Sequence, residues 1–246
     1  KWLCSLDVDD FTSSEFTDFC RSMVKEERCS YYSAARTDDR TITKEGKKAL
    51  GVLDNEFFHA EEFKNKFSNK FCSYELLMEA AKSSNVIIGD YYHIFSPARA
   101  ATLARIKRDP EDLIFIVDEG HNLASRVRSL MSQQINTFTL LRAEEEAKKY
   151  DMKEASNISS EVFNVLNMLK KDINEEGSVD KAIFLKELEN RAGDMDEIGE
   201  NLTTASEHIR KNQKRSHIAS LLRFLDSWKE AEEGYVRIIK KGQTRS

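Results

Sequence analysis

Four cysteines are the residues of this sequence best suited to bind a metal. They are Cys4, Cys20, Cys29 and Cys72, so all of them lie in the first 72 of 246 residues. The intervening gaps of 15, 8 and 42 residues contain no Cys-x-x-Cys pair, which excludes the spacing of a zinc ribbon or a ferredoxin. The clustering itself fits one four-cysteine metal site or a set of buried packing thiols, with disulfides as a third interpretation.

Two adjacent carboxylates, Asp118 and Glu119, are the strongest candidates for catalysis. They follow the apolar run 113–117, which is predicted to be a strand, and ligands bind at the carboxyl ends of strands in open α/β sheets. Nucleotide hydrolysis needs one carboxylate to hold Mg²⁺ and another to polarise the attacking water. We predict these roles for Asp118, acting through water, and for Glu119, with His121 nearby as a switch. A polar strand end leading into a helix is the competing interpretation, but the flanking apolar run and Gly-His-Asn favour catalysis.

The elements that position these residues divide at about residue 121. Before it, the apolar runs 85–90 and 113–117 are predicted to be buried strands of a parallel sheet, separated by a helix that begins at Ser96-Pro97. Helices are also predicted over 13–27, 56–70 and 73–81, and a loop over 30–55. After residue 121 the chain has no proline, and helices are predicted over 122–132, 137–149, 153–173, 179–192, 195–212 and 215–241. Their apolar stripes are more typical of a helical bundle core than of a cofactor site.

The net charge of −5 and the pI near 5.7 argue against a small domain that binds nucleic acid through bulk positive charge. Contact with DNA would therefore need a local group of cations and rings, which meet phosphates and stack on bases. The candidates are Arg21, Arg28, Tyr31, Tyr32, Arg36, Arg40, Tyr91, Tyr92 and His93. Packing around the cysteines and a solvated mixed-charge surface are the competing interpretations. No apolar run approaches the length of a membrane span, and the start lacks a signal peptide.

Several of these residues together resemble a known family. Asp118-Glu119-Gly120-His121 resembles the DEAH box of superfamily 2 helicases, with Gly120 in place of the commoner alanine. The extended string resembles the XPD branch of iron–sulfur DNA helicases, and the cysteines follow the order of that branch's cluster ligands. The segment 90–97 resembles its Tyr-x-Tyr-like segment. The chain departs from the family at Ser73, where proline is common, and the resemblance covers roughly residues 1–130.

The resemblance implies a mixed α/β and all-α fold with three parts. Residues 1–72 would form an iron–sulfur domain holding a 4Fe–4S cluster on the four cysteines. Residues 73–136 would belong to the first RecA-like motor domain, and 137–246 to a helical Arch domain that is incomplete here. The implied activity is ATP- and Mg²⁺-dependent 5′-to-3′ unwinding of DNA, with single-stranded and fork DNA as ligands. Repair proteins, nucleotide excision repair and an intracellular location (the cytoplasm or nucleoid of an archaeon, or a eukaryotic nucleus), away from membranes, are implied as well.

The sequence lacks the phosphate-binding motif that such a motor needs. No Gly-x-x-x-x-Gly-Lys-Ser/Thr occurs, and the first residue is not methionine. We therefore expect a central fragment of a longer helicase, inactive as an ATPase by itself. Two alternatives stay open: a DinG-like iron–sulfur helicase or nuclease relative, and a metal-stapled interaction module with no activity of its own.

Overall fold

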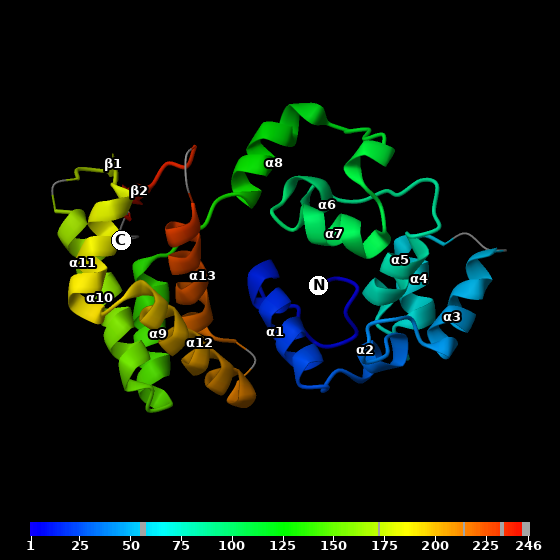
Figure 1. Ribbon diagram of the computed structural model, residues 1–246, viewed down its shortest axis with the longest axis horizontal. Coiled ribbons are helices and arrows are strands. Elements are labelled where there is room, and N and C mark those ends of the chain that lie inside the picture. The colour runs from blue at the N-terminus through cyan, green and yellow to red at the C-terminus, as the bar shows by residue number, and fades with distance from the viewer. Residues whose placement is uncertain (55–57, 172, 214, 232–233, 243–246) are drawn as a thin grey trace. The chain divides into compact units, whose positions relative to one another are not determined.

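The computed structural model describes residues 1–54, 58–171, 173–213, 215–231 and 234–242, and it divides into two compact units (Figure 1). Unit 1 comprises Lys1–Ser132 and unit 2 comprises Gln133–Ser246. Most of the described residues are helical and the described strands form one small sheet, which agrees with the expected fragment of mixed α/β and all-α fold. Within the described ranges, no helix is both long enough and apolar enough to cross a membrane.

Unit 1 is built from short helices. They are α1 (Ser13–Lys25), α2 (Ser30–Ala35), α3 (Lys44–Leu50), α4 (Ala60–Phe67), α5 (Ser73–Ala80), α6 (Tyr92–Phe95), α7 (Arg99–Ile106) and α8 (Leu123–Leu130), with 3-10 turns η1 (Gly51–Asp54), η2 (Pro110–Asp112) and η3 (Gly120–Asn122). The loop predicted over 30–55 is therefore wrong, because α2, α3 and η1 form there. Thr43 explains α3, since its hydroxyl accepts the Gly46 N–H at 2.9 Å and caps the helix. The predicted helix 56–70 is the shorter α4, and its predicted start lies outside the described residues.

The main core of unit 1 joins residues from both sides of position 72. Its buried members are Ala35, Phe63, Phe67, Phe71 and Leu76. Leu76 on α5 is thus packed with aromatic rings on and after α4, and a smaller cluster links α5 to α7. The expected domain boundary at residue 72 therefore separates no compact units in this structure.

The two predicted buried strands of unit 1 are absent. Ile88 is 96% exposed, and Ile114 and Ile116 are 93% and 92% exposed. A strand becomes a buried strand only when neighbouring strands take up its backbone hydrogen bonds. Among the described residues neither 85–90 nor 113–117 is paired with another strand, so the predicted parallel sheet is not formed by this stretch of chain.

Unit 2 is a helical bundle with a small antiparallel hairpin. Its elements are α9 (Thr137–Lys149), α10 (Lys153–Leu169), β1 (Glu176–Ser178), α11 (Lys181–Ala192), α12 (Met195–Asn212), α13 (His217–Glu230) and β2 (Ile238–Lys240). In the hairpin, Gly177 faces Ile239. The predicted helix 215–241 is too long, because Ala231 is already extended and Gly234 has a φ of 90°, a region that favours glycine. The two residues between them lie outside the described ranges.

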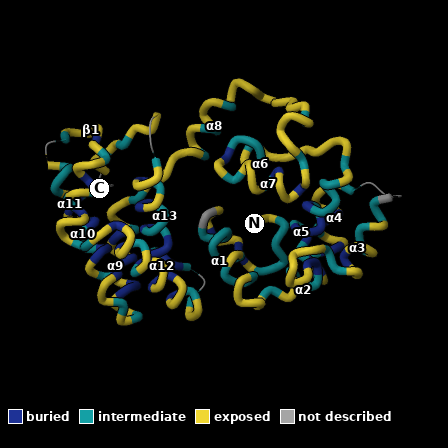
Figure 2. Tube along the Cα trace, in the orientation of Figure 1, coloured by how far each residue is buried: buried dark blue, intermediate teal, exposed yellow. Residues whose placement is uncertain are grey.

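The apolar stripes of unit 2 form its core, as predicted. Ile158, Val162 and Val165 on α10 pack in one cluster with α9, α11, α12 and α13. Aromatic rings fill its middle, where the centroids of Phe184 and Trp228 lie 4.4 Å apart. Figure 2 shows buried positions alternating with exposed ones along these helices, as one-sided packing requires.

Candidate functional site

The four cysteines lie on different elements of unit 1. Cys4 is in the loop that precedes α1, and Cys20 is within α1. Cys29 and Cys72 each occupy the N-cap position of a helix, α2 and α5 respectively. All four are free thiols and partly buried.

Two long-range hydrogen bonds draw these elements together. The Ser5 hydroxyl donates to the Ser68 carbonyl at 2.6 Å, which ties the loop of Cys4 to the segment before Cys72. The Cys72 N–H donates to the Tyr31 carbonyl at 2.8 Å, which holds the start of α5 against the first turn of α2. The sequence separation of these partners, 63 and 41 residues, means that only tertiary structure brings the cysteine segments together.

The loop before α1 is fixed on that helix as well. The Lys1 ammonium donates to the carbonyl oxygens of Asp9 and Phe11, at 2.6 and 2.7 Å. The Phe11 ring then meets Phe19 of α1 edge to face, with centroids 5.3 Å apart. This places Cys4 and Cys20 within one packed substructure.

The thiols also influence one another's ionisation. Burial raises the pKa of Cys20 to about 11, and the negative charges of Cys4 and Cys29 add to that rise. Burial likewise raises the pKa of Cys72 to about 12, with smaller contributions from Glu75, Cys20 and Cys29. The pKa of Cys4 is raised too, by burial first and then by Cys29. The four thiols therefore share one region of unit 1.

The four thiols share a region without forming a finished cage for one ion. Within the described residues, which include all four cysteines, no three or more His, Cys, Asp or Glu side chains are arranged to hold a metal ion. A tetrahedral zinc site needs its sulfurs around a single ion, whereas in a 4Fe–4S cluster each cysteine binds a different iron. The donor set of four thiols matches either group in chemical type.

The acidic pair lies in an exposed turn just before η3. The Asp118 carboxylate accepts the N–H of Glu119 at 2.9 Å, and Glu119 itself has a positive φ of 49°. His121 Nδ1 lies 3.1 Å from Glu119 Oε2, so the three predicted catalytic residues are brought together. Carboxylates are the residue type that holds hydrated Mg²⁺ and polarises water in nucleotide hydrolysis, although these three side chains are not arranged around one ion here.

Tyr91 fixes this turn through a contact that the sequence pattern did not predict. Its hydroxyl donates to the carbonyl oxygen of Asp118 and, at 3.3 Å, to that of Glu119. Tyr91 had been a candidate for stacking on DNA bases, whereas here its polar end holds the acidic turn. No local signal links residues 27 positions apart, so the sequence pattern could not reveal this contact.

Arg36 was predicted to contact DNA, and its position in the structure contradicts that prediction. Its side chain is only 6% exposed, and it pairs with Glu75 at 2.9 Å and with Glu79 at 2.5 Å. A guanidinium committed to two carboxylates inside the protein is not presented to a phosphate. Glu75 also binds Arg105 of α7 at 2.6 Å. The sequence pattern did not predict these partners, although the four-residue spacing of Glu75 and Glu79 places them on one face of a helix.

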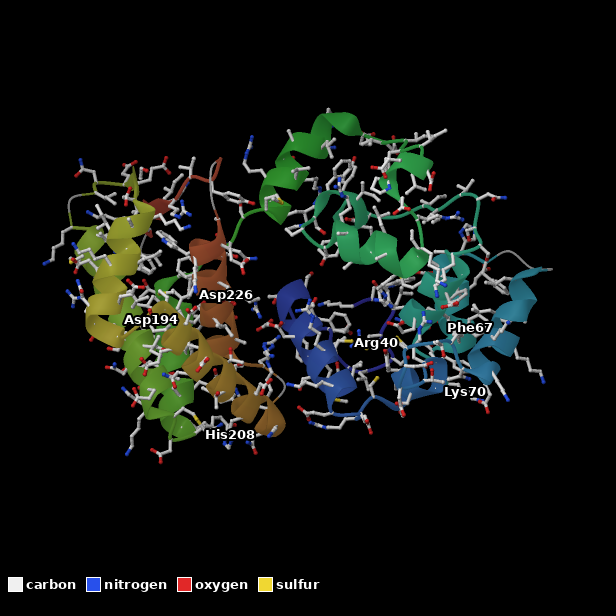
Figure 3. The ribbon with its side chains drawn as sticks, in the orientation of Figure 1. Arg40, Phe67, Lys70, Asp194, His208 and Asp226 are labelled. Carbon is white, nitrogen blue, oxygen red and sulfur yellow. The ribbon has the colours of Figure 1, made fainter. Side chains whose placement is uncertain are left out.

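The other candidate DNA contacts differ in how accessible they are. Arg21 and Arg40 are exposed, Arg40 in the turn that follows α2 (Figure 3). Tyr92 is 44% exposed, with its ring edge to face with His93. Arg28 is exposed but pairs with Glu26 at 2.9 Å, and Tyr31 and Tyr32 are partly buried near the cysteines.

Known proteins resemble this chain in the region that contains the cysteines and the acidic turn. The family model described as DEAD_2 matches residues 3–140, which include all four cysteines and the acidic turn. A protein named regulator of telomere elongation helicase 1 homolog, from Caenorhabditis briggsae, is 30% identical over 134 residues, or 53% of this chain. Its namesake from Caenorhabditis elegans is 28% identical over the same length. The matched residues make up 12% of each relative, so this chain corresponds to a small part of those proteins.

Proposed function

The chain belongs to the DEAD_2 family, and from this membership we propose that it is the central part of an ATP-dependent DNA helicase. The observation that carries the proposal is a single family match that spans the four gathered cysteines and the Asp118–Glu119 turn. Both groups of residues lie in one compact unit, unit 1. The function is thus proposed for the longer protein, of which these residues supply two characteristic sites.

In this proposal Cys4, Cys20, Cys29 and Cys72 hold a 4Fe–4S cluster. The donor chemistry fits, because four free thiols share one region whose elements are tied by long-range hydrogen bonds. When bound, the cluster would cross-link short helices whose own core is small, as metals do in other thin-cored domains. Its part is structural, and it would stiffen the region that separates the two DNA strands.

Asp118 and Glu119 would serve nucleotide hydrolysis. Asp118 would hold Mg²⁺ through water, and Glu119 would polarise the attacking water, with His121 close enough to sense that carboxylate. Because the sequence has no P-loop, we propose that this chain alone does not turn over ATP. The phosphate-binding residues would come from the rest of the motor.

The exposed segments 85–90 and 113–117 support a motor domain completed by other residues. Their isoleucines reach 92% exposure or more at positions 88, 114 and 116, which is unusual for a contiguous apolar run. We propose that both segments pair with further strands of a RecA-like sheet. That pairing would place Asp118 at the end of a buried strand.

The path of the DNA is proposed from the accessible side chains. Arg21, Arg40 and Tyr92 can meet phosphates and bases of a single strand, and the helical unit 2 would form the Arch beside it. Unwinding would run 5′ to 3′ on fork DNA. We propose the XPD-type arrangement and a repair context; the branch of the telomere-elongation relatives is the alternative, and a DinG-like protein ranks below both.

The catalytic proposal is tested in the full-length protein with Glu119→Gln. The variant should bind ATP yet hydrolyse it about 10²–10⁴ times more slowly, because the water loses its base. It should also fail to unwind a fork with a 5′ single-stranded tail. Glu111→Gln is the matched control, since Glu111 is an exposed glutamate in the nearby turn η2. Normal hydrolysis by Glu119→Gln would contradict the assignment.

The cofactor is tested by anaerobic purification of this chain. We expect a brown protein with broad absorption near ~400 nm and about four irons per chain. Cys29→Ser should lose both the colour and the iron. A colourless protein with one zinc per chain would contradict the cluster.

A further inference from the structure

Two helices of unit 1 each begin at a cysteine and lie against each other. Cys29 is the N-cap of α2, and Arg36 is the residue that ends this helix. Cys72 is the N-cap of α5, and Glu75 and Glu79 follow in its first and last turns. Each short helix therefore connects a cysteine at its start to a charged side chain further along the same helix.

The two helices are fastened at two points. At the cysteine end, the Cys72 N–H donates to the Tyr31 carbonyl at 2.8 Å. At the other end of α2, Arg36 Nε donates to the Glu75 carboxylate at 2.9 Å, and Arg36 Nη2 donates to the Glu75 carbonyl at 3.2 Å. Arg36 Nη1 reaches Glu79 at 2.5 Å. Two separated attachment points fix both the distance and the rotation of one helix on the other.

The Arg36 attachment is buried, which makes it rigid. The side chains of Arg36 and Glu75 are 6% and 9% exposed, so water cannot easily replace either partner. Arg105 of α7 adds a second cation to Glu75 at 2.6 Å, and Lys82 adds one to Glu79 at 2.7 Å. The carboxylates are held from both sides, and the guanidinium of Arg36 is the group that reaches both of them.

We infer that Arg36 is a positioning residue that sets the spacing of the Cys29 and Cys72 thiols by locking α2 onto α5. It touches neither sulfur and acts through Glu75 and Glu79. The identity of the group bound by the thiols rests on the proposed function, whereas the spacing itself is a property of the metal-free chain. Lysine should replace Arg36 poorly, since a single ammonium cannot donate to both carboxylates and a carbonyl in this planar arrangement.

The test uses the whole 246-residue chain with Cys4→Ser and Cys20→Ser, reduced and free of metal. Dibromobimane, which becomes fluorescent when it joins two neighbouring thiols, then reports on Cys29 and Cys72. Each cross-linking rate is divided by the rate at which monobromobimane labels Cys72 in the same variant, so that the comparison measures proximity and not the exposure of one thiol. Arg36→Met should lower the rate of cross-linking about tenfold or more, because the two thiols lose their fixed proximity. Arg36→Lys should fall between Arg36→Met and the parent.

Arg28→Met is the matched control. Arg28 is also an arginine next to Cys29, but it is 51% exposed and pairs locally with Glu26, two residues away. Its cross-linking rate should stay within about twofold of the parent, since surface ion pairs contribute little to structure. Circular dichroism of every variant shows whether the helices are intact.

The inference is overturned if folded Arg36→Met cross-links as fast as Arg28→Met. If Arg36→Met does not fold, Glu79→Gln decides, because it removes one branch of the attachment and leaves Glu75 in place. A Glu79→Gln rate equal to that of Arg28→Met then overturns the inference, and a several-fold lower rate supports it. Iron binding by the four-cysteine chain is measured separately, so absence of iron in the parent refutes the proposed cofactor without touching the spacing result.

Discussion

Burial decides the chemistry of individual thiols in unit 1. Burial raises the pKa of Cys20 and of Cys72, and nearby negative charges add to it: those of Cys4 and Cys29 at Cys20, and those of Cys20 and Cys29 at Cys72. Both effects favour the protonated form. Metal binding requires the thiolate, so it must release protons from these groups. In the metal-free chain Cys20 and Cys72 should therefore react slowly.

This protonation predicts slow alkylation of the reduced, metal-free chain. With pKa values of about 11 and 12 against an ordinary value of 9.0, Cys20 and Cys72 should react with iodoacetamide at pH 8 about 100 and 1000 times more slowly than an exposed thiol. Peptide mass spectrometry gives each rate. In urea the four rates should converge. Equal rates for Cys72 in the folded and unfolded chains would contradict the prediction.

At the scale of elements, the start of α13 is capped by a residue of another helix. Glu146 of α9 is buried, and its carboxylate accepts the Ile218 N–H at 2.9 Å and the Ser216 hydroxyl at 3.1 Å. These partners lie 72 and 70 residues away in sequence. A helix N-terminus favours a nearby negative charge, so the Glu146 carboxylate stabilises the first turn of α13 and holds it against α9.

Glu146→Ala should lower the free energy of unfolding by about 1–3 kcal/mol, because buried donors lose their acceptor. Urea unfolding measures the change, and Glu145→Ala is the control, since Glu145 is exposed and its salt bridge is with Arg142 on the same helix. Burial raises the folded-state pKa of Glu146 above 4.5. The folded state then takes up the proton first, so the stability contribution of Glu146 falls as pH rises from about 4.5 through that pKa. Glu146→Gln should remove this dependence. A loss with Glu145→Ala equal to that with Glu146→Ala would contradict the cap.

At the scale of the whole molecule, the two units have separate cores. The core of unit 2 draws all its buried residues from positions 140–228, with Ile135 and Ile239 packed at its edges. The cores of unit 1 lie between residues 35 and 106. Separate cores mean that each unit carries its own stabilising burial.

Residues 133–246 should therefore fold alone, with helical circular dichroism and one cooperative thermal transition. In this fragment Leu202→Ala should cost about 2–5 kcal/mol, because Leu202 is fully buried. Leu141→Ala should cost about 0.5 kcal/mol or less, since Leu141 is 44% exposed. A fragment without a cooperative transition would show that unit 2 depends on unit 1.

The sequence pattern predicted a helix correctly where the residues of that helix alone carried the pattern. The helical patterns over 137–149 and 195–212 predicted α9 and α12 to the residue, and Asp118-Glu119 and the four cysteines were the residues from which the candidate site was proposed. The same reasoning failed at 85–90 and 113–117, because an apolar run predicts a strand only if partner strands are present. It also failed at α2 and α3, whose short helices depend on one cap and on packing against α5.

The sequence by itself thus named the candidate residues for chemistry and determined which helices form in unit 2. Tertiary structure alone decided that Arg36 pairs with Glu75 inside the protein rather than facing solvent, that Tyr91 holds the Asp118 turn, and that Glu146 caps α13. Each of these contacts joins residues 27 or more positions apart. Their partners are set by how whole helices pack, and neither residue type nor local spacing carries that information.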